Sequence, residues 1–420
     1  MHGYNEGMWK PAAALVVILL ASSGPAGARP EDPGAEGLKA LDARQYDVAA
    51  QCFTKAVEAD PKDYSAHFNL ALANSMLGKN DAAIAGYKKV LELKPALHEA
   101  ELNLGIVLLG GKRAAEALPY LEASANGRPT ALRPRLYLST ALLETGDLVK
   151  AEQSFRTALE LDPKSAAAEL GLAQALARQS RLPDADPHFR RAAELDPSYR
   201  DRLLELAELY QKAGQTAAAI ALYQQFPDNV AVRERLGQLL MEAGKPAEAI
   251  PQLEWAVKQA PTSANRLALA QAYRDNHQPD KALPLLAQAA DAAPQDLDLR
   301  MAYGRALRDQ RSFVEAAEQF VRVAQAKPES APAWSELAAV LALLENYPQT
   351  LAALDRVRAL GAETPGHLFL RAVALDHMRD YKGALPAYQA FLARSQGKNP
   401  DEEFKARQRI RVIEIVLNKR

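Results

Sequence analysis

Seven histidines and one cysteine are the residues of this 420-residue chain best suited to metal binding or nucleophilic chemistry. Their spacing favours neither a metal site nor a nucleophilic active site. No H-E-x-x-H pair occurs, and one cysteine cannot supply the thiolates of a structural zinc site. His367 and His377 are ten residues apart, too far to present a ligand pair on one helical face. Cys52 is interpreted as a half-buried small residue, and no metal site is predicted.

The stretch GIVLLGGKR at 105–113 has the outline of a phosphate-binding loop but lacks its essential residues. Ile106 stands where the first glycine is required, and Arg113 stands where serine or threonine should follow the lysine. No nucleophile-elbow or dinucleotide-binding glycine pattern follows a strand. We therefore predict no cofactor and a protein that is not an enzyme.

Composition narrows the possible partners. The chain is 48% hydrophobic and 25% charged, with a formal net charge of −1. Nucleic-acid binding needs a clustered basic surface, so a nucleic-acid partner is not expected. Aromatic residues make up only 6%, and alanine is abundant, which favours helices packed closely together.

The N-terminus has the three parts of a secretory signal peptide. Lys10 precedes the apolar run AAALVVILLA at 12–21, and Ala26-Gly27-Ala28 is a small-x-small cleavage site. About ten apolar residues cannot cross a bilayer, which requires roughly 20. We predict that residues 1–28 are removed and that the chain is exported, to a periplasm or outside the cell, with no membrane span after cleavage. An uncleaved anchor is the alternative, and Met8 is a second candidate start.

A period of 34 residues runs through the rest of the chain. The phrases VEADP, LELKP, LELDP and AELDP end at prolines of this period: Pro61, Pro95, Pro129, Pro163 and Pro197. With that proline at position 32, repeats begin near 30, 64, 98, 132, 166, 200, 230, 263, 297, 331 and 365. Apolar spacings of three and four within each repeat predict two amphipathic helices, joined by turns such as LGKND and KAGQT.

Three positions of the repeat define how its helices pack. Position 8 is always small, position 20 is alanine in all repeats except one, and position 24 is always large. Two helices approach closely where neither carries bulk, and a large residue then fills the remaining gap. The residues at position 24 are Phe53, Tyr87, Leu121, Phe155, Phe189, Tyr223, Leu253, Leu286, Phe320, Leu354 and Tyr388.

With two helices in 34 residues and these residue types at positions 8, 20, 24 and 32, the chain resembles the tetratricopeptide repeat family over about 30–394. The resemblance implies an all-α, right-handed solenoid of about eleven stacked helical hairpins with a concave inner face. It also implies that each repeat contacts only its neighbours. After the last repeat, residues 395–420 are expected to form a C-terminal capping helix, because Asn399-Pro400-Asp401 is a helix start signal. Binding of something acidic by the basic residues of this helix is the alternative.

Two irregularities suggest a division of the array. Repeat six ends four residues early at QQFPDN, and repeat ten has Ala362 in place of its proline. We predict arrays at 29–229 and 230–394, although a length variation without structural consequence is equally compatible. Proline at position 22 of several repeats should bend the second helix and remove one backbone hydrogen bond.

The first helix of each repeat, helix A, carries a second stripe that the resemblance places in the concave groove. In repeats two to four this stripe is unusually apolar, with asparagine twice at position 6. We call it the helix-A lane, and it consists of Phe68, Asn69, Leu72, Met76, Leu102, Asn103, Ile106, Leu136 and Tyr137. The amides resemble the ladders with which related proteins hold a peptide backbone. The alternative is that an adjacent helix or capping segment covers the lane and makes it core.

A weaker candidate lies in repeats seven to nine. Arg235, Arg274, Arg305 and Arg308 could accept an acidic ligand, but carboxylates nearby favour solvated ion pairs instead.

The function predicted from the sequence is therefore an interaction scaffold in a cell-envelope or secreted assembly. Its groove would bind a peptide or a partner's helix. The alternative is a polysaccharide-export or cell-wall accessory protein that binds a glycan. A glycan site would need exposed aromatic platforms, and only Trp9, Trp255 and Trp334 are present.

Overall fold

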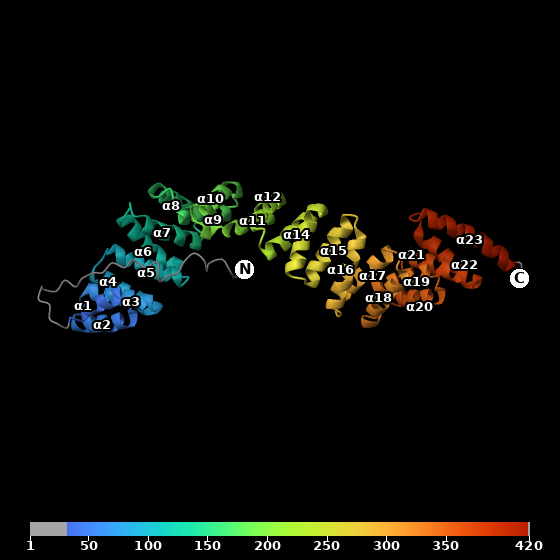
Figure 1. Cartoon of the computed structure of the whole chain (residues 1–420), viewed down its shortest axis with the longest axis horizontal. Coiled ribbons are helices and arrows are strands. Elements are labelled where there is room, and N and C mark those ends of the chain that lie inside the picture. The colour runs from blue at the N-terminus through green and yellow to red at the C-terminus, as the bar shows by residue number, and fades with distance from the viewer. Residues whose placement is uncertain (1–31, 419–420) are drawn as a thin grey trace. The chain divides into compact units, whose positions relative to one another are not determined.

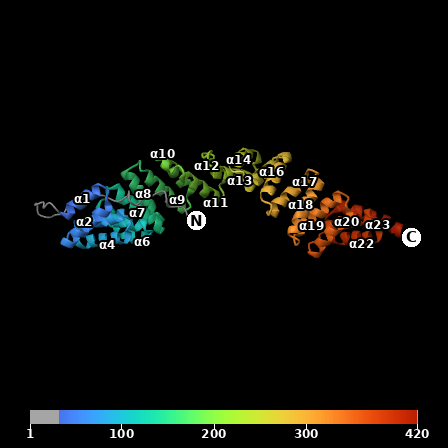
Figure 2. The ribbon, with the colours of Figure 1, turned by 60° about the horizontal axis from the view of Figure 1, so that its bottom comes forward.

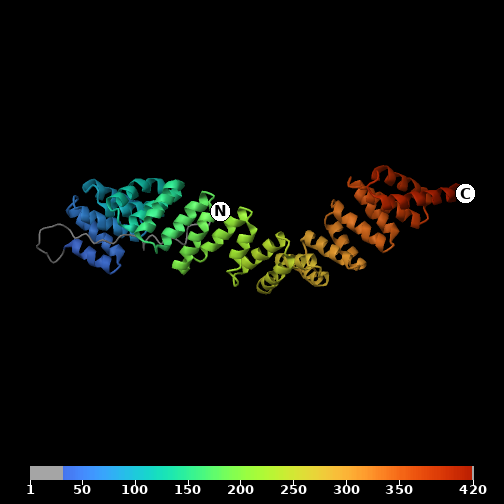
Figure 3. The same cartoon turned by 90° about the horizontal axis from the view of Figure 1, so that it is seen from above.

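The computed structural model describes residues 32–418, which form helices and connecting turns without a strand (Figure 1). The predicted signal peptide at 1–28 lies outside the described residues. Eleven helical hairpins are followed by one further helix, which confirms the expected all-α solenoid with a closing C-terminal helix. The helices of each unit follow one another in chain order, as two further views show (Figures 2 and 3).

The chain divides into two compact units between Leu222 and Tyr223. The first unit contains α1 (Pro33–Asp42), α2 (Tyr46–Ala59), α3 (Tyr64–Met76), α4 (Asn80–Leu93), α5 (His98–Gly110), α6 (Ala114–Gly127), α7 (Leu132–Thr145), α8 (Leu148–Leu161), α9 (Ala166–Arg178), α10 (Leu182–Leu195), the short helix η2 (Pro197–Tyr199) and α11 (Arg202–Lys212). The division falls inside α12 (Thr216–Tyr223), which is shorter than the second helix of every other repeat.

The second unit contains α13 (Val230–Glu242), α14 (Pro246–Gln259), α15 (Ser263–Asp275), α16 (Pro279–Ala292), α17 (Leu297–Asp309), α18 (Phe313–Ala326), α19 (Ala331–Leu343), α20 (Tyr347–Ala359), α21 (Pro365–His377), α22 (Tyr381–Ser395) and α23 (Pro400–Asn418). Odd-numbered helices from α1 to α21 are therefore the helices A of the repeats, and each even-numbered helix completes a hairpin.

Hairpin packing follows the predicted positions. A Cβ atom added to Gly37 would lie 2.8 Å from the ring of Phe53, and one added to Gly304 would lie 2.7 Å from the ring of Phe320. Position 8 is small because the side chain at position 24 of the same hairpin occupies the space. Phe53 and Phe320 are correspondingly almost completely buried.

Capping side chains and prolines set the helix ends. Asp63 accepts hydrogen bonds from the backbone N–H groups of Ser65 (2.9 Å) and Ala66 (3.2 Å) at the start of α3. Equivalent caps are Ser165, Asn229, Thr262, Asp296, Ser330 and Thr364. At the other end of the hairpin, Asp60 before Pro61 is extended, as the proline requires.

The turn inside each hairpin uses a left-handed residue at position 15. Glycine fills it at Gly78, Gly146, Gly214 and Gly244. In the other repeats the same conformation is adopted by Arg44, Lys112, Ser180, His277, Arg311, Glu345 and Arg379. A side chain with a Cβ is strained there, so these turns are held by the packing of the two helices that they join.

The closing helix is attached by polar and apolar contacts. Ala406 and Ile413 are buried in a cluster with Tyr388 and Phe391 of α22. Arg409 donates to both carboxylate oxygens of Asp376 in α21, each at 2.7 Å. This arginine of the basic run therefore holds the cap in place.

Candidate functional site

The helix-A lane lies on α3, α5 and α7 of the first unit. Met76 and Leu136 are half-buried, and the other seven lane residues are buried. The structure thus brings the lane together on three successive helices A. These helices adjoin in space, because α5 packs against both α3 and α7.

Position 6 of the lane lies against the preceding hairpin. The Nδ2 atom of Asn103 donates to the hydroxyl oxygen of Tyr87 at 3.3 Å. Tyr87 is fully buried, which raises its pKa well above the ordinary value. Gly171 has the same place in repeat five, where a Cβ would collide with the ring of Phe155. Asn103 is therefore covered by an adjacent helix, which was the alternative to its facing a partner in the groove.

Sequence reasoning missed this contact because it assigned position 6 to the partner side. The available signal was the pairing of a small or amide residue at position 6 with a ring at position 24 of the repeat before it. Phe68 contacts the same tyrosine from within its own hairpin, since its ring meets that of Tyr87 edge-on at 5.6 Å between centroids.

Position 9 distinguishes one part of the array from the rest. In repeats two to five this residue is buried, as Leu72, Ile106, Thr140 and Gln174. In repeats six to nine it is exposed, as Glu208, Gln238, Gln271 and Arg305. The buried residues are apolar or uncharged polar, whereas the exposed ones are glutamine or charged. The lane and its extension to Gln174 are thus a closed tract that the later repeats do not share.

A half-buried carboxylate lies beyond the polar end of this tract. Glu205 of α11 accepts a hydrogen bond from Nε2 of Gln174 at 3.4 Å, and Arg202 lies 3.9 Å away. Burial raises the pKa of Glu205, against the opposing effects of Gln174 and nearby arginines. Tyr137, in the middle of the lane, has its pKa raised by burial to about 12.

The four arginines predicted to accept an acidic ligand face acidic or amide oxygens of the second unit. Arg305 is 2.7 Å from Glu336 of α19, and Arg308 also pairs with Glu336. Arg235 donates to Gln238 at 3.0 Å, and Arg274 lies 3.7 Å from Asp275. An acidic ligand would have to displace these intramolecular partners.

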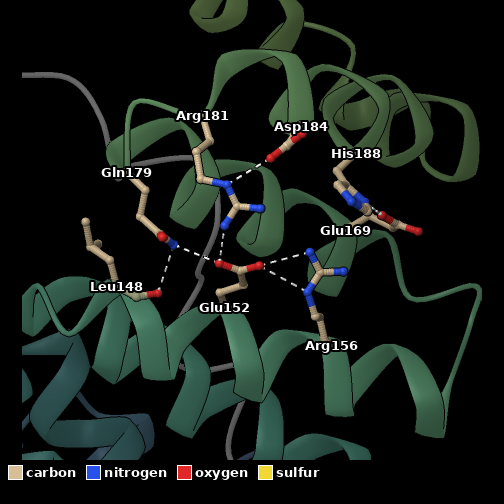
Figure 4. A network of polar contacts seen from close by, with 8 residues as sticks. All are labelled: Leu148, Glu152, Arg156, Glu169, Gln179, Arg181, Asp184 and His188. Carbon is tan, nitrogen blue, oxygen red and sulfur yellow. Dashed lines mark hydrogen bonds and ion pairs between the residues drawn. The ribbon is translucent and has the colours of Figure 1, made fainter.

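A polar network joins repeats four and five on the first unit (Figure 4). Glu152 of α8 accepts from Arg156 at 2.9 Å, from Gln179 at 3.0 Å and from Arg181 at 2.8 Å. Arg181 also donates to Asp184 at 2.8 Å. Burial of Glu152 opposes ionisation, but these donors and the arginine charges outweigh it and lower its pKa. We interpret the network as a structural link between hairpins.

Among residues 32–418, the histidines and the cysteine have ordinary surroundings. His367 completes a capping box with Thr364, and the ring of His377 stacks on Tyr347. Cys52 is free and half-buried. Within residues 32–418 no group of three histidine, cysteine, aspartate or glutamate side chains is arranged to hold a metal ion. No helix in that part of the chain is long and apolar enough to span a membrane.

The sequence profile of the tetratricopeptide repeat family matches residues 35–98, 77–131, 136–200, 204–264 and 267–332. These matches cover well over half of the chain, which therefore belongs to the tetratricopeptide repeat family. Proteins of this family mediate protein–protein interactions, and this chain is a protein-binding repeat protein in that general sense.

Individual relatives share shorter stretches. The small glutamine-rich tetratricopeptide repeat-containing protein 2 of Mycosarcoma maydis is 34% identical over 91 residues, 22% of this chain and 26% of that protein. The STIP1 homolog of Dictyostelium discoideum is 30% identical over 139 residues, 31% of this chain and 25% of that protein. The protein O-mannosyl-transferase Tmtc3 of Drosophila melanogaster is 27% identical over 110 residues, 26% of this chain and 12% of that protein.

The chain thus spans about a quarter or less of the length of these relatives. Among solved structures, MamA from Desulfovibrio magneticus RS-1 is 25% identical, with a TM-score of 0.38, over 40% of this chain and 94% of that one.

Proposed function

We propose that this protein is an exported, non-enzymatic scaffold that binds an apolar segment of a partner protein along the helix-A lane. The observation that carries the proposal is the change at position 9. The residues there are buried from Leu72 to Gln174 and exposed from Glu208 to Arg305. A surface used only for stacking would not need to differ between repeats that share the same hairpin geometry.

Burial of the apolar side chains of the helix-A lane lowers the free energy of the folded chain. Leu72 and Ile106 are buried by the chain itself, and exposing a buried leucine or isoleucine to water costs about 1.5–3 kcal/mol. A partner segment therefore has to enter at the half-buried Met76 and Leu136 and replace the contacts that it displaces. Gln174 and Glu205, beyond the far end, offer polar groups that can fix the direction of such a segment.

Photo-crosslinking from the half-buried residues tests the site. A photoreactive side chain at Met76 or Leu136 should capture the partner, and the crosslinked segment of the partner can then be synthesised as a peptide. We expect Leu136→Glu to weaken binding of this peptide at least about tenfold, or about 1.4 kcal/mol, as measured by calorimetry.

The matched control is Leu267→Glu. Leu267 has the same repeat position as Leu136 and is also half-buried, but it lies on α15 in the second unit. Equal binding by both variants, or a captured segment that lies away from Met76 and Leu136, would contradict the proposed site.

Export rests on the N-terminal signal and is tested separately. Mass spectrometry of the protein from cells that produce it should find a chain that begins at Arg29. Retention of residues 1–28 would refute the processing step without affecting the binding site.

A glycan-binding accessory role is the weaker proposal. Trp255 lies under Arg233 at 4.5 Å, and Trp334 lies near Arg356 at 5.6 Å. Both indoles are half-buried, so neither offers a free stacking platform. Trp9 lies outside the described residues.

A further inference from the structure

The apolar core of the second unit is interrupted between α20 and α21. One cluster of buried apolar side chains is formed by α17, α18, α19 and α20, and a second cluster by α21, α22 and α23. Among the half-buried side chains packed against the first cluster, Leu370 is the one that α21 contributes. The ring of His377 in α21 also stacks on Tyr347 of α20, at 4.8 Å between centroids. We call residues 365–418, which share the second cluster, the closing module.

Arg371 of the closing module stands where other repeats have leucine. Position 7 of helix A is leucine in repeats two to eight and in repeat ten: Leu70, Leu104, Leu138, Leu172, Leu206, Leu236, Leu269 and Leu337. Leu337 is buried in the first cluster, together with residues of α18 and α20. The position that provides an apolar core residue in those repeats therefore carries a cation in repeat eleven.

Ion pairs connect the closing module to α20 and to the residues that follow it. Nη1 of Arg371 lies 2.8 Å from Asp355 of α20, and Nε lies 3.9 Å from Glu363 in the connection between α20 and α21. Arg394 of α22 lies 3.5 Å from the same glutamate. The junction thus depends on charge pairs where the core of the preceding hairpins is apolar.

These ion pairs are a weak attachment. The side chain of Asp355 is 64% exposed and that of Arg394 is 55% exposed, so water and salt reach both pairs. Nε and Nη2 of Arg371 are buried without a hydrogen-bond partner. A buried donor without a partner favours any state in which water reaches it. Separation of α21 from α20 hydrates this guanidinium, whereas a leucine in its place would oppose separation.

The connection between α20 and α21 has a single residue at which the chain can bend. The connections after repeats one to nine each contain a proline, whose φ is fixed, but residues 360–364 contain none, and Pro365 is already the first residue of α21. The last backbone hydrogen bond at the end of α20 is donated by Ala362, and the first of α21 is accepted by Thr364. The backbone of Glu363 can therefore rotate without breaking either set.

We propose that the closing module separates from α20 as one unit, by rotation at Glu363, and that salt favours this opening. Contacts inside the module are stronger than those at the junction. Arg409 of α23 donates to both carboxylate oxygens of the buried Asp376 in α21, and Phe391 of α22 and Ile413 of α23 share one apolar cluster. The three helices therefore move together, and the folded array of the open state ends at α20.

Hydrogen exchange of the full chain, followed by mass spectrometry, tests whether the module opens as a unit. We expect the slowest amides of α21, α22 and α23 to share one opening free energy and to exchange at least about tenfold faster than the slowest amides of α17. Exchange that is fastest in α23 and slowest in α21 would indicate fraying from the chain end and would overturn the proposal. Protection of the module equal to that of α17 would also overturn it.

The salt response tests the nature of the junction. Raising NaCl from about 0.05 to 0.5 M should speed exchange of α21, α22 and α23 by about threefold and leave α17 unchanged, because salt screens the partly exposed charge pairs. An absence of this response would contradict an attachment by ion pairs.

Arg371→Leu tests the junction at the level of one residue. It should slow exchange of all three helices of the module by about tenfold and remove most of the salt response, because leucine replaces an incompletely paired cation. Glu363→Gln should have the opposite effect and speed exchange by about threefold, since Arg371 and Arg394 both lose a carboxylate.

Arg411→Leu is the matched control, because it makes the same change at an exposed residue of α23. It should leave the exchange of α21 and α22 unchanged. An Arg371→Leu variant that exchanges like the unsubstituted chain, or an equal slowing by Arg411→Leu, would overturn the proposal. Unchanged protection of α13 to α17 verifies that each variant keeps its fold.

Discussion

Two glutamates of the first unit show how surroundings decide the effect of a charge. Glu152 and Glu205 are both largely withdrawn from solvent, with side chains 16% exposed. Glu152 has three donors within 3.0 Å, and its pKa is lowered. Glu205 has one long hydrogen bond and a distant arginine, and burial raises its pKa.

The raised pKa of Glu205 predicts that Glu205→Gln stabilises the first unit near neutral pH. A group whose pKa is higher in the folded state adds stability below its ordinary value of 4.5 and loses it as the pH rises through the folded value. Glutamine avoids the ionisation. We expect a gain of about 1 kcal/mol at pH 7, which disappears toward pH 4, in the opening free energy of α11 measured by hydrogen exchange.

Glu152→Gln is the opposing control. Its lowered pKa means that the stability it contributes is present above 4.5 and is lost as the pH falls. This variant should therefore destabilise α8 to α10 at pH 7. A stability change of the same sign for both variants at pH 7 would contradict the pKa directions given for Glu205 and Glu152.

At the scale of the element, each hairpin has one residue with an unfavourable backbone conformation, and it lies in the turn between the two helices. Position 15 is left-handed in every repeat, whatever its residue type. The two helices therefore impose the turn conformation, because the small residue at position 8 and the large one at position 24 fix their approach.

Glycine substitution at position 15 tests this conclusion. Arg311→Gly should stabilise the hairpin of α17 and α18 by about 1 kcal/mol, because glycine adopts φ near 62° without the steric cost of a Cβ. The converse change, Gly214→Ala, should cost about 1–2 kcal/mol. Thermal unfolding measures both. Destabilisation by Arg311→Gly would show that the arginine side chain contributes more than its backbone strain costs.

At the scale of the whole molecule, stability in each unit comes from contacts between neighbouring helices. Helices separated by no more than one other helix account for the substantial contacts among the described residues. A local change should therefore remain local along the array.

Removal of residues 396–420 tests this locality. Loss of α23 uncovers Phe391 and Tyr388 and leaves the buried Asp376 without Arg409. We expect faster hydrogen exchange in α21 and α22, by about ten- to a hundredfold, while α3 to α9 keep their protection. Equal loss of protection throughout the chain would contradict nearest-neighbour stability.

The sequence by itself determined the hairpins. The 34-residue period and the residue types at positions 8, 24 and 32 predicted two helices in each repeat, and the structure has two helices in each. These features are local, because each hairpin is packed mainly by residues of its own repeat. The predicted roles of Gly37 and Gly304 at position 8 are confirmed for the same reason.

Tertiary structure decided what each helix A presents outside its own hairpin. It assigned Asn103 to Tyr87 of the preceding repeat, paired Arg305 with Glu336 of the following one, and closed the lane at Ile106 while leaving Gln271 exposed. These outcomes depend on how one repeat packs against the next. The periodic residues specify packing within a hairpin, whereas contacts between hairpins involve residues that differ from repeat to repeat.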